Sequence, residues 1–171
     1  MKTKFFLLAI LIAASTAVQA EDSKPNPSGS AGAAFARLKT LVGEWEANTS
    51  SGKAHLTYEL VSGDTALLER ESSETMPAMV TVYHVDGGRL LLTHYCMAGN
   101  QPRMQATASS LDGSEIDFQF LDATNLADPG AGHMHNAKIR IVDNSHLVSE
   151  WQFYENGKPK FTETANFTRV R

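Results

Sequence analysis

Three histidines and the single cysteine are the side chains of this sequence best suited to chemistry. His94 and Cys96 stand two residues apart within Leu90–Met104, and His133 and His135 form a His-x-His pair. Residues two apart on a β-strand point to the same side, about 7 Å from each other, which suits two metal ligands. With His94, or in its place Cys96, as a third ligand, the pair could form an open zinc-type site with hydrolytic or isomerase activity.

The same side chains could instead be the polar groups of a small-molecule pocket. Such pockets are mainly apolar and contain a few hydrogen-bonding groups. We therefore expect first a protein that binds a small, mainly apolar molecule. The ligand-binding candidates are Tyr83, His94, Cys96, Met104, His133, His135 and Trp151. The competing interpretation is that methionines and other apolar side chains fill the interior and leave no cavity.

Nucleophilic catalysis has less support in the sequence. The chain contains no Gly-x-Ser-x-Gly elbow, phosphate-binding loop or Cys-x-x-Cys pair. On one strand Cys96 and His94 would lie about 7 Å apart, so His133 or His135 would have to act as the base. As the only cysteine, Cys96 leaves no internal disulfide and is expected to be a buried thiol. We predict no catalytic residue and no particular cofactor.

The N-terminal residues resemble a secretory signal peptide. Lys2 and Lys4 precede the apolar run Phe5–Ala14, and Val18-Gln19-Ala20 has the small residues that a signal peptidase requires. This pattern predicts cleavage after Ala20 and a periplasmic or secreted bacterial protein. Residues 21–32 are rich in Pro, Ser and Gly and are predicted to be a flexible linker before one domain at 33–171.

The charge of the chain limits its partners. The formal net charge is −4, and loss of Lys2 and Lys4 with a cleaved signal peptide makes the protein more acidic. Nucleic acid and anionic membrane surfaces attract basic proteins, so neither is an expected partner. No later segment is long and apolar enough for a membrane anchor. The expected partner is a small apolar molecule, and the sequence does not specify an oligomeric state.

Hydrophobic periodicity predicts one short helix followed by strands. Ala33–Leu41 has helical spacing and ends before Gly43, and alternation begins there. Frequent turn signals predict an up-and-down antiparallel β-barrel of about ten strands, with a two-sheet sandwich as the alternative. The long gap Asp122–Gly132 would be a portal loop. The strands are predicted at Glu44–Thr49, Ala54–Val61, Thr65–Glu71, Ala78–Val85, Arg89–Met97, Arg103–Ser109, Glu115–Leu121, His133–Val142, His146–Tyr154 and Phe161–Val170.

Turn lengths predict which side chains face the interior. A two-residue loop within Asp86-Gly87-Gly88 would place Leu92, His94 and Cys96 on the same inner face as Tyr83. A three-residue loop would reverse this arrangement.

The later strands pose a similar choice. His133 and His135 alternate with outward positions and are expected to share the inner face of Ile139. In the next hairpin either Glu150 or Trp151 faces inward. We expect Trp151 inside, because burying an unpaired carboxylate is unfavourable. The opposite parity would make Glu150 an interior carboxylate near His135.

One motif connects the chain to a known group of folds. Gly43-Glu44-Trp45 after a short helix, followed by up-and-down strands, is similar to the calycin barrels, in which a Gly-x-Trp opens the first strand. Ten strands resemble the fatty-acid-binding or nitrobindin branch. Met79–Met104 and His133–His135 also resemble a group of uncharacterised secreted bacterial domains near that branch. The resemblance implies a barrel with an interior ligand site.

The chain differs from the nitrobindins and from the fatty-acid-binding proteins at residues that those families use to bind their ligands. Nitrobindins extend the motif to Gly-x-Trp-x-Gly, whereas Ala47 stands at the last position here, so haem binding is not implied. Fatty-acid-binding proteins hold a carboxylate with interior arginines. This chain offers few candidates beyond Arg103 and Arg140.

Overall fold

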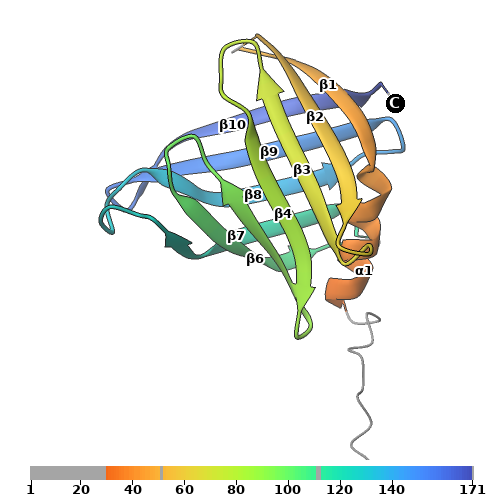
Figure 1. Cartoon of the computed structure of the whole chain (residues 1–171), viewed down its shortest axis with the longest axis horizontal. Helices are drawn as coiled ribbons and strands as arrows, with labels where there is room; N and C mark the ends of the chain where they lie inside the picture. The colour runs from red at the N-terminus through yellow and green to blue at the C-terminus, as the bar shows by residue number, and fades with distance from the viewer. Residues whose placement is uncertain (1–29, 51, 111–112, 171) are drawn as a thin grey trace, which may run out of the picture.

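Ten antiparallel strands close into a barrel with one helix at its end (Figure 1). The computed structural model describes residues 30–50, 52–110 and 113–170. Each strand pairs with its neighbour in sequence, and β1 pairs with β10 to close the sheet. The elements are α1 Ser30–Leu38, the 3₁₀ helix η1 Lys39–Leu41, β1 Gly43–Thr49, β2 Gly52–Val61, β3 Ala66–Ser73, β4 Met79–Asp86, β5 Arg89–Tyr95, β6 Gln101–Ser109, β7 Glu115–Thr124, β8 His133–Ile141, β9 His146–Glu155 and β10 Lys158–Arg169.

The predicted all-β class, strand number and up-and-down order are confirmed. The sandwich alternative is wrong, since the sheet is closed and has no free edge. The helix begins at Ser30, three residues before its predicted start, and its last turn tightens into η1. The predicted signal peptide and most of the predicted linker lie outside the described residues.

Alternation of buried and exposed side chains builds the barrel wall. On β2, Ala54, Leu56 and Tyr58 are buried, whereas His55 and Thr57 between them are exposed. This period of two places one set of side chains in the interior and the other in water. The interior is therefore built from the same apolar alternation that predicted the strands.

The helix covers the end of the barrel where β1 starts and β10 finishes. Leu38 and Leu41 are fully buried there with Trp45 of β1. The Trp45 indole Nε1 donates to the Leu41 carbonyl at 2.7 Å, and the Arg169 guanidinium lies 4.1 Å from the centroid of its ring. Arg169 also donates to the Val42 carbonyl at 2.6 Å, which holds the end of β10 against the helix. These contacts close this end of the barrel.

Replacing Trp45 with Phe should reduce the free energy of unfolding by about 2 kcal/mol. The substitution removes buried ring volume and leaves the Leu41 carbonyl without its indole donor. Urea denaturation followed by circular dichroism measures the change. Tyr95→Phe is the control, because the Tyr95 ring is exposed, and it should change stability by less than about 0.5 kcal/mol. Equal effects of the two substitutions would contradict this account of the closed end.

The β4–β5 hairpin has the predicted two-residue loop. Asp86 pairs with Arg89, and both Gly87 and Gly88 adopt positive φ angles of 53° and 84°. Such a loop needs left-handed backbone at both positions, which glycine adopts without strain. Tyr83, Thr81, Leu92 and His94 consequently lie on the inner face, as predicted.

The β8–β9 hairpin also follows the preferred prediction at its turn. Ile139 pairs with Ser149 and Ala137 pairs with Trp151, so Trp151 points inward. Glu150 lies on the outer face beside Lys138, where both line a shallow polar groove. An interior carboxylate from Glu150 is therefore excluded.

The start of β8 differs from the prediction. The pairing of β8 with β9 shifts between Met134 and Asn136, which makes His135 a β-bulge. One extra residue reverses the alternation, so Met134 and not its histidine neighbours faces the interior. The expectation that His133 and His135 share the inner face of Ile139 is wrong for this reason.

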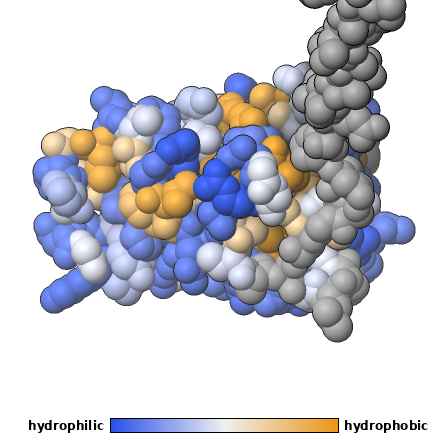
Figure 2. Space-filling model, turned by 90° about the horizontal axis from the view of Figure 1, so that it is seen from below, coloured by the Kyte–Doolittle hydropathy of each residue, from blue (hydrophilic) through white to orange (hydrophobic). Residues whose placement is uncertain are grey.

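The outer surface has no continuous apolar band on the face shown in Figure 2, where hydrophobic patches are separated by hydrophilic residues. Among the described residues, no helix is long and apolar enough to cross a membrane. The large hydrophobic side chains that are exposed are Val42, Tyr95, Met97, Leu121, Val142, Phe161 and Val170.

Candidate functional site

Side chains fill most of the barrel and leave a narrow inner pocket. Its volume is about 20 Å³, which is room for one water-sized group. Tyr83 and Met104 are fully buried in the packed part of the interior. The polar and sulfur-containing residues that line the pocket are Glu71, Met79, His94, Met134, Ser149, Trp151 and Glu163.

Buried carboxyl groups give this interior an acidic character. Burial raises the pKa of Glu69, while the hydrogen bond from the Tyr83 hydroxyl favours its carboxylate. The Tyr83 hydroxyl lies 2.7 Å from Glu69 Oε2. Burial, together with the charges of Glu69 and Glu163, raises the pKa of Glu71 to about 7. None of the described residues that line the inner pocket is a lysine or arginine.

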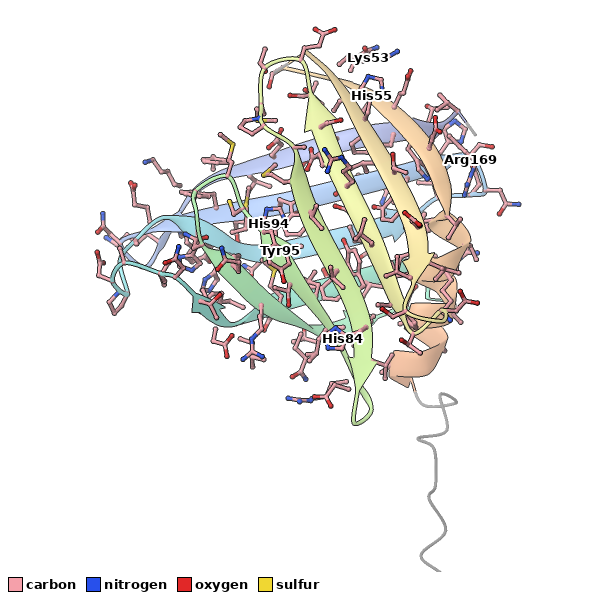
Figure 3. All side chains as sticks on the ribbon, in the orientation of Figure 1. Lys53, His55, His84, His94, Tyr95 and Arg169 are labelled. Atoms are coloured by element: carbon pink, nitrogen blue, oxygen red, sulfur yellow. The ribbon has the colours of Figure 1, made fainter. Side chains whose placement is uncertain are left out.

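His94 is the central polar group of the inner pocket. Figure 3 shows it inside the ring of strands, and its side chain is 3% exposed. Its Nδ1 lies 3.0 Å from Thr81 Oγ1, and its ring centroid lies 4.8 Å from that of Trp151. Burial lowers the pKa of His94 to about 4, so the imidazole is neutral at pH 7. Nε2 is buried and has no hydrogen-bond partner.

A larger cleft opens where β7 and β8 separate. Their pairing ends at Gln119 and Asn136; beyond this point β7 stays with β6 and β8 stays with β9. The gap holds a cleft of about 620 Å³, within the size range of small-molecule sites. Its lining is formed by Phe120, Leu121, Asp122, Ala123, Leu126, Ala127, Asp128, Pro129, His133, His135, Tyr154 and Gly157. Most of these side chains are apolar, and none of these residues is a lysine or an arginine.

Aromatic rings form one wall of the cleft. The His135 ring stacks on Tyr154 with centroids 4.0 Å apart, and on Phe120 with centroids 4.7 Å apart. His133 also contacts Phe120, with centroids 4.7 Å apart. The bulge at His135 therefore turns its imidazole into a stack between two rings, where its orientation is held by packing.

A chain of hydrogen bonds determines which ring nitrogen carries the proton in His133 and in His135. His133 Nδ1 lies 2.8 Å from the Ala131 carbonyl, which can only accept, so Nδ1 carries the proton. With the ring proton of His133 on Nδ1, its Nε2 accepts from His135 Nδ1 at 3.0 Å. His135 Nε2 is left as an acceptor. Burial lowers the pKa of His135, so its imidazole stays neutral at pH 7.

Neighbouring turns hold the loop that borders the cleft. Asn100 is buried and its Nδ2 donates to the Gly132 carbonyl at 2.9 Å. The Asn156 amide donates to the Gly130 carbonyl at 2.8 Å, and Asn125 donates to the Gly99 carbonyl. The turn that begins at Gly99 thus positions the cleft, in addition to joining β5 and β6.

The predicted ligand-binding residues that line a pocket are divided between the inner pocket and the cleft. His94 and Trp151 line the inner pocket, whereas His133 and His135 line the cleft. The zinc-type set of His94, His133 and His135 is divided between these two pockets. Among the described residues, no three histidine, cysteine or acidic side chains gather closely enough to hold a metal ion.

Cys96 lies outside both pocket linings. It is partly buried against the core, and its Sγ accepts from the Ala98 amide at 3.5 Å. Burial raises the pKa of the thiol, which keeps it protonated and poorly nucleophilic. The geometry supports a structural thiol, but the expectation of a buried thiol is met only in part, because Cys96 follows the end of β5 and is partly exposed.

Sequence reasoning missed several residues that shape the cleft. Phe120 and Tyr154 were expected only as strand residues, and Leu126 as part of a portal loop. An available signal was the group of apolar residues Leu126, Ala127 and Pro129 inside an otherwise polar loop. Comparisons with known proteins add no residue assignments: a scan against models of protein families finds no match, and neither does a search among curated proteins.

Gly132 fits between the cleft loop and β9 because it has no side chain. A Cβ at this position would lie 2.6 Å from Cζ of Phe153, whose ring stacks on Phe161. Gly132→Ala should therefore displace the Phe153 ring and reduce the free energy of unfolding by about 1–2 kcal/mol. Urea denaturation in the Phe153→Leu background is the control, where the alanine should have a smaller effect. An equal effect in both backgrounds would exclude the clash as the cause.

Proposed function

We propose that the protein binds a small, mainly apolar and uncharged molecule in the cleft between β7 and β8. The observation that carries the proposal is an apolar cleft of about 620 Å³ whose wall presents His135. The interior of the barrel leaves only about 20 Å³, so an organic ligand fits the cleft and not the interior that the sequence suggested. The closed ten-strand barrel with one short helix is compatible with the calycin-like fold.

The polar groups of the cleft select the chemistry of the ligand. His135 Nε2 is an acceptor, so it suits a hydroxyl or an N–H group on the ligand. Asp122 lines the cleft but is paired with Arg103, whose Nε donates to Asp122 Oδ1 at 2.6 Å. Asp128 also lines the cleft, and no lysine or arginine does, which disfavours an anionic ligand. A long-chain alcohol is therefore a better model ligand than the corresponding fatty-acid anion. This preference separates the proposal from a fatty-acid carrier with interior arginines.

Isothermal titration calorimetry with 1-octanol and octanoate tests this function. We expect 1-octanol to bind with at least about tenfold higher affinity, since octanoate would place a carboxylate near Asp128 in a lining that contains no lysine or arginine. His135→Phe keeps a stacked ring but removes the acceptor, and it should weaken 1-octanol binding by about five- to tenfold. Absence of 1-octanol binding, or octanoate binding of equal or higher affinity, would contradict the proposal.

We also propose that the protein acts in the periplasm or outside the cell. The support is the signal-like pattern of the first twenty residues, with Lys2 and Lys4 before an apolar run. N-terminal sequencing of protein recovered from the periplasm should begin at Glu21. A chain that stays in the cytoplasm and retains the first twenty residues would contradict this localisation.

A further inference from the structure

The inner pocket contains a buried polar atom that has no hydrogen-bond partner. His94 Nε2 is shielded from water and has no hydrogen-bond partner, although an unsatisfied buried nitrogen is unfavourable. Met79 and Met134 line the same pocket and are themselves buried. The side chains of His94, Met79 and Met134 therefore line one space of about 20 Å³.

The contact at His94 Nδ1 leaves the other ring nitrogen available for a ligand. Thr81 Oγ1 lies 3.0 Å from His94 Nδ1, and a hydroxyl oxygen can accept from a ring N–H. With the ring proton on Nδ1, Nε2 has a free lone pair. A fixed lone pair of this kind is the usual arrangement of a histidine that binds a metal ion.

The charge and size of the pocket favour a single cation. Glu71 and Glu163 line the pocket, and none of its described lining residues is a lysine or an arginine. A volume of about 20 Å³ holds one ion or one water-sized group, but not an organic molecule. The Trp151 ring beside His94 offers a further surface that attracts cations.

The donor types select a soft cation. Zinc and calcium sites use several histidine, cysteine or carboxylate ligands, and no three such side chains gather in the described part of the chain. Thioether sulfur with imidazole nitrogen is a donor set that suits Cu(I). We propose that the inner pocket binds one Cu(I) ion through His94 Nε2 and the sulfur atoms of Met79 and Met134. This site is separate from the cleft and does not depend on it.

Titration of the mature protein with Cu(I) under anaerobic conditions, in competition with a chromophoric Cu(I) chelator, tests the site. Wild type should bind one equivalent, and Ag(I), a redox-inert soft ion, should behave in the same way. Met79→Leu and Met134→Leu preserve side-chain volume and should each weaken binding at least tenfold. Met97→Leu is the matched control, because Met97 is exposed and outside the pocket lining, and it should bind as wild type does.

Cys96→Ala distinguishes the pocket from the free thiol. We expect this variant to keep the Cu(I) equivalent, since Cys96 does not line the pocket. Loss of binding in Cys96→Ala would overturn the proposal, as would unchanged binding in both methionine variants or a wild type that binds no Cu(I). Circular dichroism of each variant shows that the barrel is folded before affinities are compared.

Discussion

Ala127→Trp should abolish most of the binding of a small apolar ligand, with at least a tenfold loss of affinity for 1-octanol. Ala127 is exposed and lines the cleft, so an indole at this position would occupy the volume available to the ligand. The substitution adds no side chain to the packed interior, and the free energy of unfolding should change by less than about 0.5 kcal/mol. Calorimetric titration with 1-octanol measures the loss.

Ala78→Trp is the matched control for the cleft. Ala78 is also exposed, but it precedes β4 and does not line the cleft. The same change in residue type should therefore leave 1-octanol affinity within about twofold of wild type. If both tryptophan variants lose binding equally, the loss does not report on the cleft, and the assignment of the site fails.

Glu71→Gln should stabilise the protein by about 2–3 kcal/mol at pH 8. The folded state raises the pKa of Glu71 from 4.5 to about 7, because the carboxyl is buried and lies near the charges of Glu69 and Glu163. A raised pKa means that the folded state retains a proton that the unfolded state has released. Stability from this group is therefore lost as the pH rises from about 4.5 to about 7. Glutamine removes that loss.

The pH dependence of the stability difference tests the cause. Urea denaturation of Glu71→Gln and wild type should give a difference that is near zero at pH 4, grows through pH 5–7 and is constant above pH 8. Glu163→Gln removes one of the charges that raise the pKa of Glu71, and an NMR titration should show that pKa falling. A stability difference that does not depend on pH would indicate a packing effect of the amide instead.

Much of the fold follows from local patterns that the sequence contains. The alternation on β2 and the Gly87-Gly88 loop determine which residues face inward, since a strand has a period of two. Trp151 was placed inside because burial of its ring is favourable and burial of Glu150 is not. These predictions hold because each one depends on a short stretch of chain.

The position of the candidate site depends on long-range geometry instead. The bulge at His135 reverses which face of the strand the preceding side chains point to. Nothing in the His133–His135 motif signals an extra residue. The cleft exists because β7 leaves β8 after Gln119, a separation that involves two strands and a loop. A pattern within one strand cannot report such a separation, so the histidines were assigned to the interior.

The central claim is that the ligand binds in the cleft between β7 and β8 and not in the barrel interior. Methyl NMR spectra of the mature protein during titration with 1-octanol test it most directly. The account predicts chemical-shift changes at Leu121, Leu126 and Ala127, which line the cleft, and unchanged methyl signals from the inner pocket. Shifts confined to inner-pocket methyl groups such as those of Leu56 and Ala165, with the cleft signals unchanged, would contradict it.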